Sequence, residues 1–320
     1  MVQTPRSTCD LTQHSPLTGV HRADVALRNA PHCAWQHPPL QLVIFWINMR
    51  GHTQRAAHAA DTLARALSRV GSLGNNVVVQ HSTRFEAIAP TCSKAGQPCK
   101  LNAPWSRWNA SEVFAMEPSK LRQHTPRRKR GFAIGNWLSH PNCYQQCLDT
   151  APLPDACLVM EDDAGLAPGV LQALPCVLRR LDDAVGRGWH ALRLGCWGSR
   201  FADDCIRPPN LFFAQSHAFN SSAEALAPGG GMAYGGAHLT LVRPATTLAE
   251  LVGRLLQMGV MAIDVGLTNP PRHQQAAHAW QAGRAGRQRR SGAEPLRSYV
   301  LDHPGAYIDH RLDGLESSRA

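Results

Sequence analysis

Three consecutive carboxylates, Glu161, Asp162 and Asp163, directly follow the apolar run Cys157-Leu158-Val159-Met160. The run predicts a fully buried strand, and open α/β sheets bind their ligands at the carboxyl ends of their strands. Three adjacent negative charges repel one another, and a divalent cation would relieve that repulsion. Because Mg²⁺ and Mn²⁺ prefer carboxylate oxygen, one interpretation is a metal site. The other is an acidic turn exposed to solvent at the end of a strand.

Polar side chains also follow the first apolar run of the chain, residues 41–47. Asn48 and Arg50 come directly after it, and Arg55 follows in an expected helix. We expect these residues at the same sheet edge as the acidic residues. Either arginine would suit a phosphate, which a guanidinium can bind through two hydrogen bonds. The alternative for both is an ordinary arginine on a helix surface.

Two further residues are candidates for chemistry. Asp264 follows the apolar run 260–263, for which we expect a strand, and would serve as a general base, a second metal ligand or a helix cap. Asp203 and Asp204 are alternative bases. His140 would contact phosphate or metal, or be satisfied by the backbone near a helix start.

The elements that must position these residues alternate between strands and helices. Strands are expected at 41–47, 77–79, 85–88, 157–160, 189–194, 237–242, 260–263 and 299–301. The helices between them have apolar faces, listed here in chain order: Ala60, Leu63, Ala64 and Leu67; Val170, Leu171, Leu174, Val177, Leu178 and Leu181; Leu248, Leu251, Val252 and Leu255. This order predicts an α/β fold, a single domain with a mostly parallel central sheet flanked by helices.

The domain is expected to span 39–270. Residues 1–38 predict a disordered leader, and 271–320 a basic loop and C-terminal tail that is partly packed on the domain. A long polar loop is expected at 90–130, ending in the basic run Arg127-Arg128-Lys129-Arg130. The Gly229-Gly230-Gly231 segment lacks a phosphate-loop lysine and predicts a flexible loop.

Composition limits the possible partners and the compartment. The net charge of +10 favours anionic partners, among them nucleotide phosphates, acidic glycans and nucleic acid. No apolar run approaches the roughly 18 residues of a spanning helix. Without a visible secretory signal we expect a cytoplasmic protein or one peripheral to a membrane, with the endomembrane lumen as the alternative. Ten cysteines, Cys143 and Cys147 among them, slightly favour buried free thiols in a reducing compartment over zinc ligands.

The order of four motifs resembles glycosyltransferase family 25, the lipooligosaccharide and procollagen galactosyltransferase family. The motifs are Phe45-Trp46-Ile47-Asn48 with Arg50 and Arg55, Arg84-Phe85-Glu86-Ala87, Gly135 through Ser139-His140, and Leu158 through Asp163. A weaker similarity continues through Ala233-Tyr234 to Asp264. Together the motifs span about residues 41–270, most of the expected domain.

The resemblance implies a GT-A-like fold and a metal-dependent, inverting transfer of a sugar, with galactose expected, from a UDP-sugar to a hydroxyl group. The acceptor would be a glycan, lipooligosaccharide or glycoprotein. Glu161 and Asp163 would bind Mn²⁺ or Mg²⁺, and Asp264 would be the catalytic base. The donor would be bound by the following residues: Asn48, Arg50, Arg55, Asp162 and His140.

Two other functions remain open at this stage. One is a non-catalytic relative that binds nucleotide sugars or glycans. The other is a basic nucleic-acid-binding protein, suggested by the arginine-rich segments 127–130 and 284–290. These segments lack interleaved aromatic residues on which bases would stack, so we expect no nucleic-acid partner.

Overall fold

The computed structural model describes residues 38–70, 76–90, 127–166, 169–194, 213–215, 237–258, 263–267, 296–301 and 306–308. The strands are β1 (Leu40–Asn48), β2 (Val77–Glu86), β3 (Ala156–Glu161), β4 (Ala164–Leu166), β5 (Ala191–Arg193), β6 (Phe213–Gln215), β7 (Leu239–Val242), β8 (Ser298–Leu301) and β9 (Ala306–Ile308). The helices are α2 (Thr53–Leu67), α5 (Arg127–Asp149), α6 (Val170–Val185), α7 (Leu248–Met258) and α8 (Ile263–Leu267).

A mixed seven-stranded sheet forms the centre of the molecule, in the order β2-β1-β3-β7-β5-β8-β6. Strands β2, β1, β3, β5 and β8 run in one direction, whereas β7 and β6 run against their neighbours. Strands β4 and β9 form a separate antiparallel pair. The predicted α/β class, with flanking helices and a sheet whose strands run mostly in parallel, is therefore confirmed.

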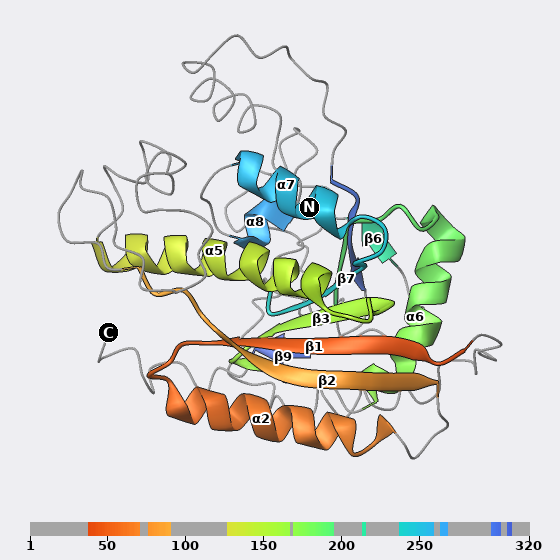
Figure 1. Ribbon diagram of the computed structural model, residues 1–320, viewed down its shortest axis with the longest axis horizontal. Helices are drawn as coiled ribbons and strands as arrows, with labels where there is room; N and C mark the ends of the chain where they lie inside the picture. Colours follow the sequence, from red (N-terminus) through yellow and green to blue (C-terminus); the bar gives the residue numbers. More distant parts are fainter. Residues whose placement is uncertain are drawn as a thin grey trace, which may run out of the picture.

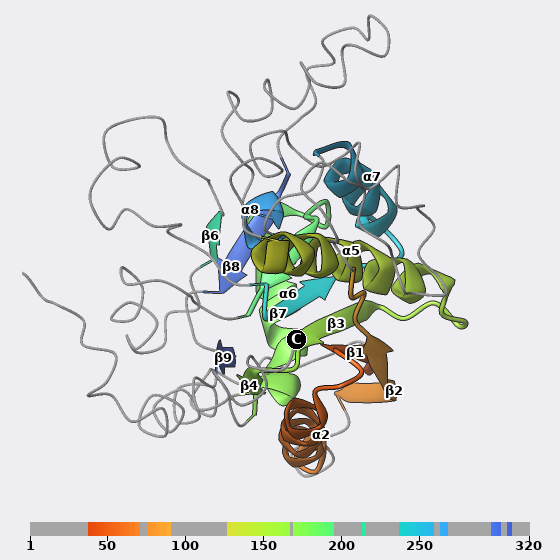
Figure 2. The same cartoon turned by 90° about the vertical axis from the view of Figure 1, so that its left-hand side faces the viewer.

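Helices cover both faces of this sheet (Figures 1 and 2). Leu42 and Ile44 of β1 pack into one core with α2 and α6, and Val43 and Phe45 pack into a second core with α5, α7 and α8. Because alternate residues of a strand point to opposite faces, both faces of β1 must be apolar. This explains why the strand appears in the sequence as an unbroken apolar run.

Several sequence expectations hold in detail. The run ahead of the acidic residues is the buried strand β3, and its carboxyl end is where the three carboxylates lie. All six residues predicted for the apolar face of α6 are buried, as are the four predicted for α7. The strand expected at 299–301 is present as β8, which lies inside the sheet between β5 and β6.

Four local expectations are wrong. The buried face of α2 consists of Ala59, Thr62, Leu63 and Ala66, so the predicted face is rotated. The two short strands expected at 77–79 and 85–88 are one strand, β2, with a register irregularity opposite Leu42/Val43. Asp264 lies in the helix α8 and not at the end of a strand. The basic run 127–130 does not end a loop but forms the first turn of α5.

Other expectations fall outside the described residues. They concern the leader up to residue 37, the segments 229–231 and 272–292, and the alternative bases Asp203 and Asp204. Among the described cysteines, Cys143, Cys147 and Cys157 are free and buried, and Cys176 is disulfide-bonded. Burial raises the pKa of the Cys143 and Cys147 thiols well above the usual value. In the described part of the chain, no helix has both the length and the apolar character needed to cross a membrane.

Candidate functional site

Asn48 and Asp162 join the ends of two neighbouring strands. Strands β1 and β3 are parallel, with Ile47 opposite Glu161, so their carboxyl ends reach the same sheet edge. Asn48 is buried, and its Nδ2 donates a hydrogen bond of 2.6 Å to Asp162 Oδ2 and one of 3.2 Å to the carbonyl oxygen of His52. This side-chain amide thereby holds the acidic turn against the loop that leads into α2.

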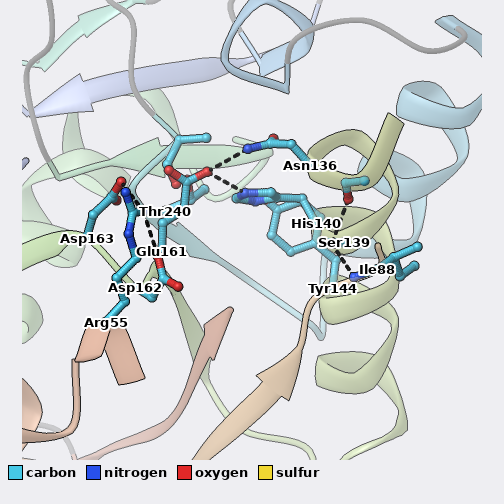
Figure 3. Close-up of polar contacts among 12 residues, drawn as sticks. Arg55, Ile88, Asn136, Ser139, His140, Tyr144, Glu161, Asp162, Asp163 and Thr240 are labelled. Atoms are coloured by element: carbon cyan, nitrogen blue, oxygen red, sulfur yellow. Dashed lines mark hydrogen bonds and ion pairs between the residues drawn. The ribbon is translucent and has the colours of Figure 1, made fainter. Parts of the chain in front are cut away.

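Arg55 contacts both aspartates from the first turn of α2. Its Nη1 lies 3.3 Å from Asp162 Oδ1 and 3.1 Å from Asp163 Oδ2 (Figure 3). Burial raises the pKa of Asp162 above its usual value, although the Asn48 hydrogen bond and the charge of Arg55 act in the opposite direction. One guanidinium nitrogen thus compensates two carboxylates at the end of β3.

Asp163 is the least compensated member of the acidic group. Its Oδ1 is buried, and none of the residues that the structure describes forms a hydrogen bond with it. Burial, together with repulsion from Glu161 and Asp162, raises the pKa of Asp163 to about 7, even though Arg55 lowers it. A partly buried carboxylate with an unpaired oxygen is unfavourable unless it binds a proton or a cation.

Glu161 turns away from the two aspartates, towards α5. Its Oε1 accepts a hydrogen bond from His140 Nε2 at 3.0 Å and another from Asn136 Nδ2 at 3.3 Å (Figure 3). Burial alone would raise the pKa of Glu161, but His140, helped by His238 and Asn136, lowers it below the usual value. Glu161 is therefore held as a carboxylate by protein groups.

A close approach of α5 to the segment after β2 places His140 next to Glu161. A Cβ added to Gly135 would lie 2.4 Å from the carbonyl oxygen of Ile88, so only glycine allows α5 to pack at this distance. Ser139 Oγ donates to the carbonyl oxygen of Gly135 at 2.6 Å and accepts from the Ile88 N–H at 2.9 Å. The Gly-x-x-x-Ser-His motif therefore fixes α5 against the end of β2 and directs its histidine to the acidic site.

A layer of buried polar groups lies behind Glu161. Tyr144 Oη is 3.5 Å from His140 Nδ1 and also bonds to the Thr240 side chain, and its pKa is raised by burial. His238 accepts the Glu161 N–H at its carbonyl oxygen, and both nitrogens of its buried ring lack hydrogen-bond partners. Burial lowers the pKa of His238 to about 4, so its ring is neutral at physiological pH.

The predicted site residues are thus brought together in part. The structure places six of them at one edge of the sheet: Asn48, Arg55, His140, Glu161, Asp162 and Asp163. Arg50 lies in the exposed turn between β1 and α2. Asp264 is the second residue of α8, which packs on α5 where Gly266 meets the Trp137 ring, and its side chain lies outside the described part.

Sequence reasoning missed four polar residues of the site. Asn136 and Tyr144 lie four residues before and after His140, and this helical spacing is a signal that would have found them. His238 and Thr240 alternate along the segment that includes β7, but no motif marks them in the sequence.

The donor set fits a divalent cation at Asp163 more closely than at Glu161. Asp163 presents an unpaired buried oxygen, and hard cations take carboxylate oxygen. Glu161 Oε1, by contrast, already accepts two hydrogen bonds. Among the residues that the structure describes, no cluster of three or more His, Cys, Asp or Glu side chains is arranged to hold a metal. A cation here would therefore take its remaining ligands from a bound phosphate or water, as Mg²⁺ commonly does.

Comparisons with protein-family models and with curated proteins find no match to this chain.

Proposed function

We propose that this protein is a metal-dependent, inverting glycosyltransferase with a GT-A-like domain. It transfers a sugar, expected to be galactose, from a UDP-sugar to a hydroxyl group of a glycan, lipooligosaccharide or glycoprotein. The observation that carries the proposal is the partly buried Asp163 carboxylate just after β3, whose buried Oδ1 has no hydrogen-bond partner among the described residues. The order of the four motifs in the sequence supports the same assignment.

In this proposal, the two sides of the acidic turn have different tasks. Asp163, with Asp162 beside it, would hold Mn²⁺ or Mg²⁺, and such a cation would supply positive charge against the negative charge of the leaving UDP. Glu161 lies on the α5 side of the site, where hydrogen bonds from His140 and Asn136 fix its position. Glu161 would be the second metal ligand through Oε2, the oxygen to which His140 and Asn136 do not donate.

Arginines supply the positive charge that a diphosphate requires. Arg55 and the exposed Arg50 flank the start of α2, whose first turn contains no acidic residue. The partial positive charge of a helix N-terminus also favours an anion in this place. Asp264, on α8, takes the proton of the acceptor hydroxyl as that hydroxyl attacks the anomeric carbon.

The proposed activity is compatible with two cellular compartments. A cytoplasmic enzyme, or one peripheral to a membrane, would meet nucleotide sugars and lipid-linked acceptors. The disulfide-bonded Cys176 suits an oxidising compartment such as the endomembrane lumen, so both places are retained in the proposal.

The test is a panel of UDP-sugars scored by released UDP, with and without Mn²⁺, and with simple glycosides as acceptors. The proposal predicts Mn²⁺-dependent UDP release that one sugar supports best and that an acceptor accelerates. If UDP binds with Mn²⁺ but no donor turns over, the chain is a non-catalytic nucleotide-sugar binder. If UDP does not bind at all, the proposal fails.

A further inference from the structure

We propose that His190 is a pH-sensitive clip: with a neutral ring it fastens the C-terminal strand β8 to β5 and α7, and a proton on its Nδ1 releases that strand. This role does not depend on the proposed function. His190 is buried directly before β5, and two segments that are distant in the sequence meet at its ring. Arg297, directly before β8, contacts one ring nitrogen, and Glu250 of α7 lies beside the other.

His190 and Arg297 exchange two hydrogen bonds where the pairing of β5 with β8 begins. The His190 N–H donates to the Arg297 carbonyl oxygen at 2.8 Å, and the Arg297 N–H donates to His190 Nδ1 at 2.9 Å. The parallel register then starts at the next residue of each strand, with Ala191 opposite Ser298. A side-chain nitrogen is thus the acceptor for the backbone N–H that leads into β8.

The position of the ring proton decides whether this contact can exist. An imidazole nitrogen accepts a hydrogen bond only while it carries no proton. Because Nδ1 accepts from Arg297, the proton of the neutral ring belongs on Nε2, which lies 3.3 Å from Glu250 Oε2. A second proton, on Nδ1, would set two N–H donors against each other at the 2.9 Å contact. The hydrogen bond would then be lost, and the segment that leads into β8 would separate from His190.

The surroundings of the ring favour its neutral form. Among the described residues, the charged groups that face it are Glu250 and Arg254 on α7 and Arg297 before β8. Burial, helped by the two arginines, lowers the pKa of His190 below its usual value of 6.5, although the half-exposed Glu250 acts in the opposite direction. A histidine whose pKa is lowered in the folded state binds its proton more readily after release. The attachment of β8 is therefore strongest above about pH 6.5 and weakens as the pH falls below that value.

Release of β8 would also affect the acidic turn. Strand β8 lies inside the sheet between β5 and β6, and the next strand along the chain is β9. Strand β9 pairs with β4, which begins at Ala164 directly after Asp163. The C-terminal strands therefore reach from the His190 clip to the acidic turn, so acid release of β8 loosens the strand pair that follows Asp163.

The experiment measures amide hydrogen exchange by mass spectrometry in the full chain at pH 7.5 and pH 5.5, corrected for the intrinsic effect of pH on exchange. For wild type we expect peptides that cover β8 to exchange at least about tenfold faster at pH 5.5, while peptides from β1 and β3 keep their protection. His190→Asn keeps a side-chain acceptor that does not titrate, so its β8 peptides should show no such change. His81→Asn is the matched control, because His81 is exposed on β2 at the opposite edge of the sheet, and this variant should behave like wild type.

NMR of the wild-type protein provides a second readout if His190→Asn folds poorly. Long-range proton–nitrogen spectra report which ring nitrogen carries the proton, and we expect an unprotonated Nδ1 at pH 7.5 and a charged ring only where the β8 amides lose protection. Equal β8 exchange at both pH values in wild type, or the same acid-induced loss in His190→Asn, would overturn the inference. A uniform loss of protection throughout the sheet, or a charged His190 ring while β8 stays protected, would overturn it as well.

Discussion

Asn48 and Asp162 are 114 positions apart in the sequence, yet Asn48 Nδ2 donates a buried hydrogen bond of 2.6 Å to Asp162 Oδ2. The parallel pairing of β1 with β3 brings them together, because both strands end at the same sheet edge. The bond orients Asp162 and favours its ionised form. Asp163, the next residue, has no comparable amide donor on its buried Oδ1, and this difference gives the two aspartates different properties.

Gly135→Ala should destabilise the protein and disturb the site. The new Cβ would lie 2.4 Å from the Ile88 carbonyl oxygen, a backbone atom that cannot move cheaply. We expect a loss of about 1 to 3 kcal/mol in the free energy of unfolding, the range of substitutions that force backbone shifts in a packed core. Urea unfolding measures it. Gly253→Ala is the control, since open space surrounds that position in α7 and alanine there should stabilise by up to about 1 kcal/mol. Equal effects at both glycines would contradict the proposed packing.

His140→Leu should raise the pKa of Glu161. The histidine lowers that pKa against the effect of burial, and only the Asn136 hydrogen bond to Oε1 would remain. Isotope-edited NMR of the Glu161 carboxyl carbon measures the shift directly. His140→Gln retains a side-chain donor and should restore part of the wild-type value. An unchanged Glu161 pKa in the leucine variant would show that the 3.0 Å contact has no electrostatic importance.

Asp163→Asn should make metal-free protein relatively more stable as the pH rises. The folded-state pKa of Asp163 is about 7, above the usual value of 3.8, so this group favours the folded state at low pH and loses that contribution as the pH rises from about 4 to about 7. Asparagine does not titrate, so the variant lacks this pH-dependent contribution to stability. The stability difference between variant and wild type should therefore shift by about 2 kcal/mol in favour of the variant between pH 5 and pH 8. Urea unfolding in EDTA at both pH values tests this, and a difference independent of pH would contradict the raised pKa.

Asp264→Asn separates three roles for this residue. A general base contributes roughly 10²–10⁴-fold, so turnover should fall by that factor while UDP-sugar affinity changes little. A metal ligand would lose affinity and turnover together. A helix cap, a role compatible with its place near the start of α8, would cost about 1 kcal/mol of stability and leave turnover of the folded fraction intact. Normal turnover per folded molecule would exclude the base assignment.

The buried face of a helix can be predicted from the sequence where large apolar residues recur at helical spacing. The faces of α6 and α7 are built from large aliphatic residues at helical spacing, and each predicted position is buried. In α2 six of the eight apolar residues are alanines, whose small side chains mark neither face clearly, and Thr62 is buried although it is polar. Strand β2 is polar and largely exposed between its ends, so only its pairing with β1 shows that the two predicted strands are one.

The sequence predicts which residues lie at the site, but it does not predict which of them contact one another. The apolar run before Glu161 identifies the strand end, and the parallel sheet then implies that Asn48 lies nearby. The sequence could not predict that Glu161 contacts α5 whereas Asp162 and Asp163 contact Arg55 of α2. These contacts depend on how closely the two helices approach the sheet. The apolar run before Asp264 fits a strand as well as a helix, and Asp264 itself lies in the helix α8, where Gly266 packs against Trp137.

The most direct test of the central claim is calorimetric titration of UDP into wild type and Asp163→Asn, each with Mn²⁺ and with EDTA. Asparagine keeps the side-chain volume and removes the charge, and circular dichroism confirms that the variant is folded. If Asp163 holds the cation, Mn²⁺ should strengthen UDP binding by wild type at least about tenfold, which is about 1.4 kcal/mol, and should leave UDP binding by the variant unchanged. The same Mn²⁺ enhancement in both proteins would contradict the account.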